Sequence, residues 1–247
     1  MERTHFRGPS APLREPVPAL AAYEAGIAAI CQLASQFDDL TWGAQTPCPE
    51  WRAFELAGHL RCVADDFHEY LDEAPVSRYA RLMATGAHPD TLGRKLARQN
   101  AAELAALADA PPAEHIAAFA LSARRYAGRL IAVWDLPHHQ YRDTWVTVGG
   151  MAGAACAEWH LHAWDLARAL GADYQPADPV AVLAGWRAGM PQLPLPAGSL
   201  GARAVRHHDP WHAVLAASGR LTPGRAAGAS RSAWAAWPAR LRRRRRD

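Results

Sequence analysis

Three polar side chains between Glu158 and Asp165 have the spacing of a metal site on one helix face. At about 100° per residue, Glu158 and His162 lie about 40° apart, one turn from each other, and Asp165 lies about 20° from Glu158. Trp159 and Leu166 continue an apolar stripe beside them. Because burying an unpaired carboxylate costs several kcal/mol, this face needs a compensating partner, which a divalent cation would supply.

A third ligand must then come from another helix, and His59 is the candidate. It stands at the edge of an apolar stripe in a separate helical segment. Glu55, one turn earlier, is placed to orient the second ring nitrogen of His59, with Asp66 a poorer candidate. Together with Glu158 and His162, His59 makes three ligands with a coordination position left open, which is typical of catalytic rather than structural zinc sites.

Each piece also has a plain structural explanation. A Glu–His pair four residues apart is usually a salt bridge, and a single histidine beside an apolar stripe is usually a core residue. His160 points to the opposite face from His162, and the pair His138-His139 is expected in a loop, so none of these is expected to be a ligand. Two further candidates are disfavoured, namely a group of His207, His208 and His212 and the thiol of Cys48, for which packing in a turn is favoured.

Helical periodicity dominates the elements that must position these residues. Apolar spacing of three to four predicts helices over about 17–37, 51–71, 91–107, 116–133 and 148–170, the last with Thr147 as its N-cap and Gly171 after its end. Residues 72–89 form a long connection broken by prolines, and alternation is weak, limited to 141–148. The sequence therefore predicts an all-α protein, a four-helix up-down bundle with a long crossover.

Beyond this bundle the pattern is poor. Short helices are expected over 180–186 and 211–217, and the residues after Pro223 have the composition of a disordered segment. The predicted organisation is a metal-binding bundle at 17–171, a reduced C-terminal region packing on it at 172–223, and an Arg-rich tail at 224–247 that is dispensable for the fold.

Charge and composition exclude several classes of protein. The 247 residues carry a net charge of +3, but residues 1–200 have a balance of −6 and residues 201–247 a balance of +9. A solvated basic tail on an acidic body does not favour a nucleic-acid binder. No apolar run suggests a membrane span or a secretory signal, and four cysteines without paired spacing indicate a reducing, cytoplasmic location.

Two motifs carry a resemblance to a known family. The segment Thr46-Pro-Cys-Pro-Glu-Trp51, followed by Glu55-Leu-Ala-Gly-His-Leu60, resembles a motif of the DinB/YfiT-like metal-binding superfamily, and more narrowly of the mycothiol-dependent maleylpyruvate isomerase-like N-terminal domain family. The segment Glu158 to Gly171 is similar to that family's second motif. The resemblance covers about residues 17–171 and implies a four-helix bundle that binds a divalent metal, commonly zinc, through His59, Glu158 and His162.

The chain also departs from the family pattern. Isomerases of this type carry a second α/β domain that contributes an arginine to catalysis, whereas the 76 residues after Gly171 show no convincing set of strands. Glu55 stands where the family usually has Asp. The ending from Asp209 to Pro223, with Arg220 in it, resembles a common family C-terminus. Maleylpyruvate is therefore in doubt as the substrate.

These observations favour an enzyme whose metal, most simply Zn²⁺, activates a low-molecular-weight thiol for addition to a small electrophile. The resemblance implies mycothiol as the thiol cosubstrate, with cis–trans isomerisation or S-transfer as the outcome. Asp165 is the candidate second-sphere residue, and Arg81 or Arg94 is a candidate clamp for a substrate carboxylate. The alternatives are a non-catalytic metal-binding stress or partner module and a non-haem iron enzyme of the thiol-oxidation type. A monomer or dimer is expected, without membrane or nucleic-acid partners.

Overall fold

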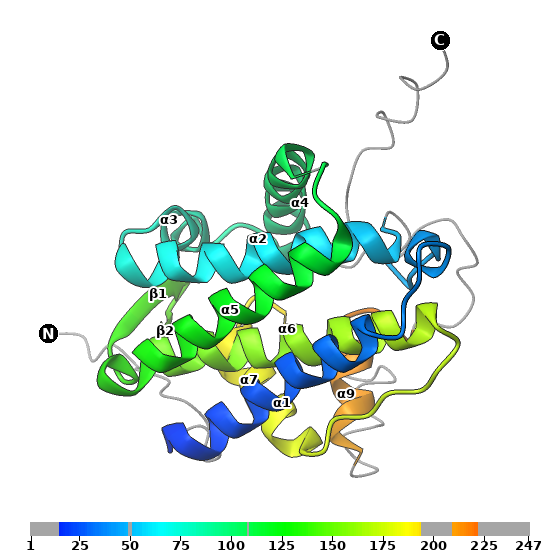
Figure 1. Ribbon diagram of the computed structural model, residues 1–247. Coiled ribbons are helices and arrows are strands. Elements are labelled where there is room, and N and C mark those ends of the chain that lie inside the picture. Colours follow the sequence, from blue (N-terminus) through cyan, green and yellow to red (C-terminus); the bar gives the residue numbers. More distant parts are fainter. Residues whose placement is uncertain (1–14, 49–50, 108, 194–208, 222–247) are drawn as a thin grey trace, which may run out of the picture.

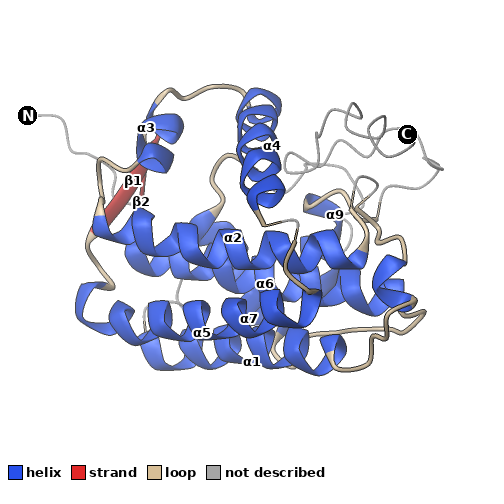
Figure 2. Ribbon diagram, turned by 45° about the horizontal axis from the view of Figure 1, so that its top comes forward, coloured by secondary structure: helices blue, strands red, loops and turns tan. Residues whose placement is uncertain are grey.

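The computed structural model describes residues 15–48, 51–107, 109–193 and 209–221. Its described part is mainly helical, with one two-stranded hairpin (Figures 1 and 2). The α-helices are α1 (Pro16–Ala34), α2 (Ala53–Asp72), α3 (Arg78–Ala84), α4 (Pro89–Ala106), α5 (Pro112–Leu130), α6 (Val148–Ala169), α7 (Pro179–Gly189) and α9 (Pro210–Ala217). Two short 3₁₀ turns, η2 (Thr41–Gly43) and η3 (Ile131–Val133), and the strands β1 (Pro137–Tyr141) and β2 (Thr144–Thr147) complete the described elements.

Helices α1, α2, α5 and α6 form the predicted four-helix bundle, and the crossover sets its topology. Ser122 on α5 donates to Asp65 on α2, and seven residues further along both helices Arg129 pairs with Asp72. Contacts that advance together along both helices mean that α2 and α5 run in the same direction. The chain returns from the end of α2 to the start of α5 through α3 and α4, which lie over α2 (Figure 1).

Helix α6 is the most buried element and carries two of the candidate ligands. It packs against α1 on one side and α7 on the other. Trp159 of α6 is fully buried and contacts the rings of Tyr23 on α1, Phe67 on α2 and Phe119 on α5. All four bundle helices therefore meet at one aromatic side chain, whose burial fixes the rotation of α6 about its axis.

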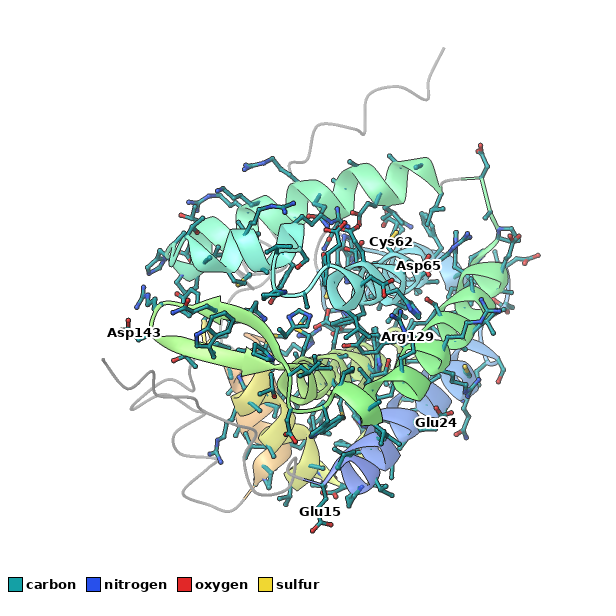
Figure 3. The ribbon with its side chains drawn as sticks, turned by 90° about the vertical axis from the view of Figure 1, so that its left-hand side faces the viewer. Glu15, Glu24, Cys62, Asp65, Arg129 and Asp143 are labelled. Atoms are coloured by element: carbon teal, nitrogen blue, oxygen red, sulfur yellow. The ribbon has the colours of Figure 1, made fainter. Side chains whose placement is uncertain are left out.

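Local sequence determines where α6 begins and ends. The Thr147 side chain accepts a hydrogen bond from the Gly150 backbone N–H at 3.0 Å, so the predicted N-cap is confirmed. At the other end Gly171 has a φ of 71°, a left-handed conformation that glycine adopts without a Cβ penalty. The antiparallel hairpin before α6 puts Asp143 in its turn, where it points away from the body of the protein (Figure 3).

Close backbone contact joins α7 to α6. A Cβ on Gly185 would lie 2.5 Å from the carbonyl oxygen of Gly153, and one on Gly189 would lie 2.3 Å from that of Gly150. These glycines let the two helices approach more closely than any other residue would allow. The helices α7 and α9 pack on each other and α7 packs on α6, so these two described helices after the bundle form part of the same folded unit.

The structure extends and corrects the sequence expectations in several places. Helix α3 lies within the segment 72–89, which was expected to be irregular, and α7 ends three residues later than predicted. Among the described residues, α1 is long and apolar enough to cross a membrane, which the sequence analysis did not expect. Its Tyr23 and Ile27 are nevertheless buried in the protein core. The tail 224–247, with its predicted disorder and dispensability, and His207-His208 lie outside the described residues.

Candidate metal centre

The predicted ligands His59, Glu158 and His162 meet between α2 and α6. His59 Nε2 lies 3.7 Å from Glu158 Oε1, and His162 Nε2 lies 3.0 Å from the same oxygen. All three ligand atoms lie within 4.8 Å of one another, and all three side chains are buried. The helical spacing places Glu158 and His162 one turn apart, and the packing of α2 against α6 supplies His59.

Asp165 fixes the orientation of His162. Its Oδ2 lies 2.9 Å from His162 Nδ1, the ring nitrogen that faces away from Glu158. When Nδ1 carries a hydrogen it donates to this carboxylate, which turns Nε2 toward Glu158 and His59. A carboxylate behind a histidine is a recurring arrangement at metal sites, because it sets the tautomer and raises the basicity of the ligand nitrogen.

Arg220 is a site residue that the sequence reasoning did not single out. It follows α9 and donates from Nε to Asp165 Oδ1 at 2.9 Å and from Nη2 to Oδ2. Asp165 is fully buried, and the Arg220 side chain is only 12% exposed. The C-terminal region thus reaches the bundle through a bidentate ion pair directly behind His162. The only available signal was the family-like ending around Arg220, which gives no spatial partner.

The described residues of the motif, Thr46 to Cys48 and Trp51, lie against the same site. Thr46 donates from its hydroxyl to the Trp51 carbonyl at 2.7 Å, which closes the turn. The Trp51 ring packs on His59 with centroids 4.2 Å apart, and Cys48 Sγ lies 3.5 Å from Asp165 Oδ2. Cys48, His162 and Asp165 also form a group that could hold an ion. The predicted turn packing of Cys48 therefore places its thiol against the residues behind the candidate ligands.

The ionisation of the site follows from burial and from close opposite charges. Burial lowers the pKa of His59 to about 4, so this ring is neutral at physiological pH. Burial raises the pKa of Asp165, but Arg220 and His162 outweigh it and bring the value to about 2. Burial likewise opposes ionisation of Glu158, yet the two histidines hold its pKa below its ordinary value. Burial lowers the pKa of His162, and Glu158 and Asp165 more than reverse this and raise it.

The donor set fits a divalent cation. Neither ring nitrogen of His59 has a hydrogen-bond partner in the described part of the chain, although the ring is 2% exposed. Leaving a buried polar atom unsatisfied costs about 1–3 kcal/mol, and coordination by Nε2 would remove half of this deficit. The observed separations of 3.0 and 3.7 Å bracket the distance of about 3.3 Å between ligands of tetrahedral zinc. Two histidines and one carboxylate leave a coordination position free.

The two residues considered as partners of His59 have other roles. Glu55 accepts a hydrogen bond from the Arg52 backbone N–H at 2.8 Å and so caps α2. Asp66 accepts from Tyr70 at 2.8 Å and pairs with Arg78. The expectation that Glu55 orients His59 is therefore wrong, because the capping hydrogen bond holds its carboxylate at the helix end.

Arg81 and Arg94, the candidate substrate clamps, lie on the surface. Arg81 donates to the Val76 carbonyl, and Arg94 donates to Thr91 at 3.2 Å. Both side chains are exposed, and neither lines the cavity described below. Their role in substrate binding stays a prediction.

Of the remaining histidines, His160 lies on the face that the sequence predicts, whereas His138 and His139 do not lie in a loop as predicted. His160 faces α1, with Nε2 3.0 Å from the Ala22 carbonyl oxygen, on the side opposite His162. His138 and His139 lie on β1 rather than in a loop, and both are buried with their Nδ1 atoms 3.0 Å apart. A register irregularity between Pro137 and His139 interrupts the alternation that would otherwise turn adjacent side chains to opposite faces.

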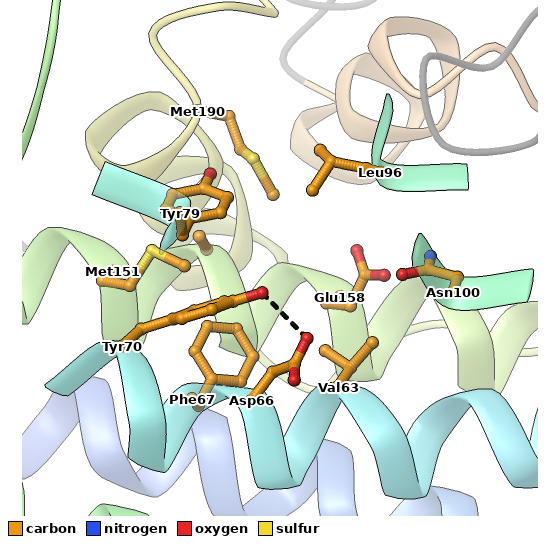
Figure 4. A pocket seen from close by; sticks show the side chains of 11 residues that line it. Val63, Asp66, Phe67, Tyr70, Tyr79, Leu96, Asn100, Met151, Glu158 and Met190 are labelled. Atoms are coloured by element: carbon orange, nitrogen blue, oxygen red, sulfur yellow. Dashed lines mark hydrogen bonds between the residues drawn. The ribbon is translucent and has the colours of Figure 1, made fainter. Parts of the chain in front are cut away.

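A cavity adjoins the candidate metal centre at Glu158. It contains about 440 Å³ of space not filled by protein atoms, part of it open to solvent (Figure 4). Its walls come from α2, α3, α4, α6 and the segment after α7, and are Val63, Asp66, Phe67, Tyr70, Tyr79, Leu96, Asn100, Met151, Ala154, Glu158 and Met190. The candidate ligand Glu158 thus borders a largely apolar space that is partly open to solvent.

The protein is therefore a helical bundle with a candidate His–Glu–His metal site on two facing helices. The model of the mycothiol maleylpyruvate isomerase N-terminal domain family matches residues 23–167. This is more than half of the chain, so the protein belongs to that family, as its motifs predicted. Neither the curated proteins nor the solved structures gave a match. The family associates the chain with a mycothiol-related, metal-dependent role and with isomerase-like enzymes.

Proposed function

We propose that this protein is a metal-dependent enzyme that activates a low-molecular-weight thiol, mycothiol, and adds it to a small electrophile. The observation that carries the proposal is the position of Glu158, which is shared between the His59–His162 cluster and the cavity. A purely structural metal site would need no adjoining space. A non-catalytic module would need no open coordination position.

Each residue of the candidate site has its own part in activating the thiol. His59, Glu158 and His162 would hold the ion, and Zn²⁺ bound there supplies a Lewis acid that lowers the pKa of a coordinated thiol. Asp165 keeps a proton on His162 Nδ1, so that Nε2 stays available. Trp51 shields His59 from water. The cavity receives the electrophile beside Glu158.

Reversible addition to a conjugated alkene, followed by rotation and elimination, gives cis–trans isomerisation, whereas a retained adduct gives S-transfer. Isomerisation and transfer differ only in whether the carbon–sulfur bond persists, so the same residues serve both. The protein would act in the cytoplasm on a small-molecule substrate, as its four cysteines without paired spacing lead us to expect.

Cobalt substitution tests the proposal directly. Adding mycothiol to the cobalt-loaded protein should produce a sulfur-to-metal charge-transfer band, and the zinc form should accelerate thiol addition to a conjugated electrophile at neutral pH. His162→Ala should abolish both effects, and Asp165→Asn should reduce the affinity for the metal by about 10–100-fold. An unchanged spectrum without acceleration would favour the non-catalytic metal module. Oxygen consumption with ferrous iron and thiol would favour the iron enzyme.

A further inference from the structure

Two buried histidines on β1 lie outside the candidate metal centre, and none of the roles above uses them. His138 and His139 are both 0% exposed, and their Nδ1 atoms lie 3.0 Å apart. The register irregularity between Pro137 and His139 gives β1 one residue more than β2 at this point, so two consecutive side chains turn inward. The sequence predicted a loop here and therefore no ligand, whereas the strand brings the two imidazole rings together inside the protein.

The pair is costly as a purely structural element. Only one ring can carry its hydrogen on Nδ1, and it donates this hydrogen to the Nδ1 of the other ring. The Nε2 atom of each ring has no hydrogen-bond partner within the described residues. Leaving buried polar atoms unsatisfied is destabilising, and two apolar side chains would avoid this loss. A pair of imidazoles retained at such a cost points to a ligand that uses their nitrogens.

Both rings can offer a lone pair to one cation. Burial lowers the pKa of His138 to about 4. Burial, together with the neighbouring ring, also holds the pKa of His139 well below its ordinary value, so both imidazoles are neutral at physiological pH. At 3.0 Å apart, the two Nδ1 atoms can both reach one ion at about 2.0–2.1 Å, the distance usual between histidine nitrogen and zinc.

The surroundings of the pair favour a monovalent cation over a divalent one. No Cys, Asp or Glu among the described residues completes a group of three ligand atoms with His138 and His139. A divalent ion would therefore be buried here without an anionic ligand, and the cost of burying an ion rises with the square of its charge. Imidazole is a good ligand for copper, and Cu(I) is its monovalent ion.

The route from solvent to the pair leads past Tyr79. Its ring contacts the rings of His139 and His138, with centroids 5.0 and 6.4 Å apart, and the same side chain lines the partly open cavity. Met151 and Met190 line this cavity near Tyr79 (Figure 4). Thioether sulfur is a soft ligand that selects Cu(I), so the cavity walls offer transient ligands between solvent and the histidines.

We propose that His138 and His139 form a second metal site, which binds one Cu(I) ion through their two Nδ1 atoms. The ion takes the place of the hydrogen between the rings. This hydrogen moves to the Nε2 of the same ring, so the number of protons on the pair is unchanged. The assignment does not depend on the proposed thiol chemistry.

Competition with bathocuproine disulfonate, a chromogenic Cu(I) chelator, tests the site in the full chain under anaerobic, reducing conditions. The background is His59→Ala/His162→Ala, which removes the other centre, and it should retain one Cu(I) per chain. Adding His138→Gln or His139→Gln should abolish this retention. Adding His160→Gln should not, because this buried histidine already has a partner on each ring nitrogen and serves as the matched control.

Two outcomes of the competition would overturn the assignment. Copper retained after both His138→Gln and His139→Gln would place the ion elsewhere in the chain. A background variant that yields all its copper to the chelator would mean that the two histidines are a hydrogen-bonded pair only.

NMR of wild type labelled with ¹⁵N at its histidines covers the case in which these substitutions disturb folding. Cu(I) is diamagnetic, so the ring signals stay observable. One equivalent of Cu(I), added after zinc, should move both Nδ1 signals of His138 and His139 to metal-bound positions and leave both Nε2 atoms protonated. The exposed His88 is the internal reference and should not change. Unchanged signals of the pair would refute the site, and signals that already move with zinc would refute the choice of a monovalent ion.

Discussion

The ion pair between Arg220 and Asp165 should be one of the strongest tertiary interactions in this protein. Asp165 is fully buried and lies on the central helix α6, while Arg220 comes from the segment after α9. Replacing Arg220 by Met removes the charge and keeps most of the volume. Asp165 would then be left with His162 and Cys48 as its polar neighbours.

The loss of stability in Arg220→Met follows from the burial of Asp165. The pKa of Asp165 falls from 3.8 to about 2 in the folded protein, and each pKa unit is worth about 1.4 kcal/mol, so the attraction of its partners exceeds the opposing effect of burial by about 2 kcal/mol. Because the pKa is lowered, this stability is present above about pH 4 and is lost as the pH falls toward 2. Breaking a buried ion pair by removing one member costs about 3–5 kcal/mol. At about 2–4 °C per kcal/mol, the melting temperature of Arg220→Met should fall by roughly 6–20 °C.

Denaturation and metal competition form the assay. The double variant Asp165→Asn/Arg220→Met should cost less than the sum of the single variants, because it leaves no unpaired buried charge. The control is Arg168→Met, which removes a surface pair with Asp173 whose side chains are 47% and 99% exposed and should change stability by at most about 1 kcal/mol. Zinc affinity of Arg220→Met, measured against a chelator, should fall by about 10–100-fold. If Arg220→Met were as stable as Arg168→Met, the C-terminal segment would not hold Asp165 as the geometry requires.

Elemental analysis of purified protein never exposed to chelators should find about one divalent metal per chain. His59→Ala should lose most of this metal because it lacks one ligand, and His160→Ala should keep it because His160 faces α1. Metal-free wild type would contradict this. Gly189→Ala should destabilise the protein by about 1–3 kcal/mol, since the new methyl would overlap the α6 backbone. Gly128→Ala, at an exposed position of α5 where a Cβ meets nothing within 4 Å, should instead stabilise it by about 0.5–1 kcal/mol. Equal effects of the two glycine variants in chemical denaturation would show that α6 and α7 can separate freely.

Local chemistry was sufficient to predict the helices and most of the candidate centre. Apolar periodicity defined the four bundle helices within a few residues, and Thr147 and Gly171 marked the ends of α6 because capping depends on neighbouring residues alone. The spacing of Glu158 and His162 put both on one face, since the helical repeat fixes that relation. His59 was found at the edge of the apolar stripe of its own helix, and the family followed from the motifs around His59 and Glu158.

Long-range packing decided what the sequence could not. The parallel direction of α2 and α5 depends on how α3 and α4 carry the chain back, and although periodicity predicts the helix at α4, it does not give the direction in which that helix crosses the bundle. Glu55 had the spacing to orient His59, but a hydrogen bond to its own helix end was available at shorter range. Arg220 lies 55 residues from Asp165 along the chain, and Cys48 lies 117 residues from it. The cavity that joins Asn100 to Glu158 exists only where α4 lies over α2 and α6. Side-chain types and helical spacing determine which groups share a face, whereas contacts between faces arise from the burial of the whole core, and no local pattern encodes them.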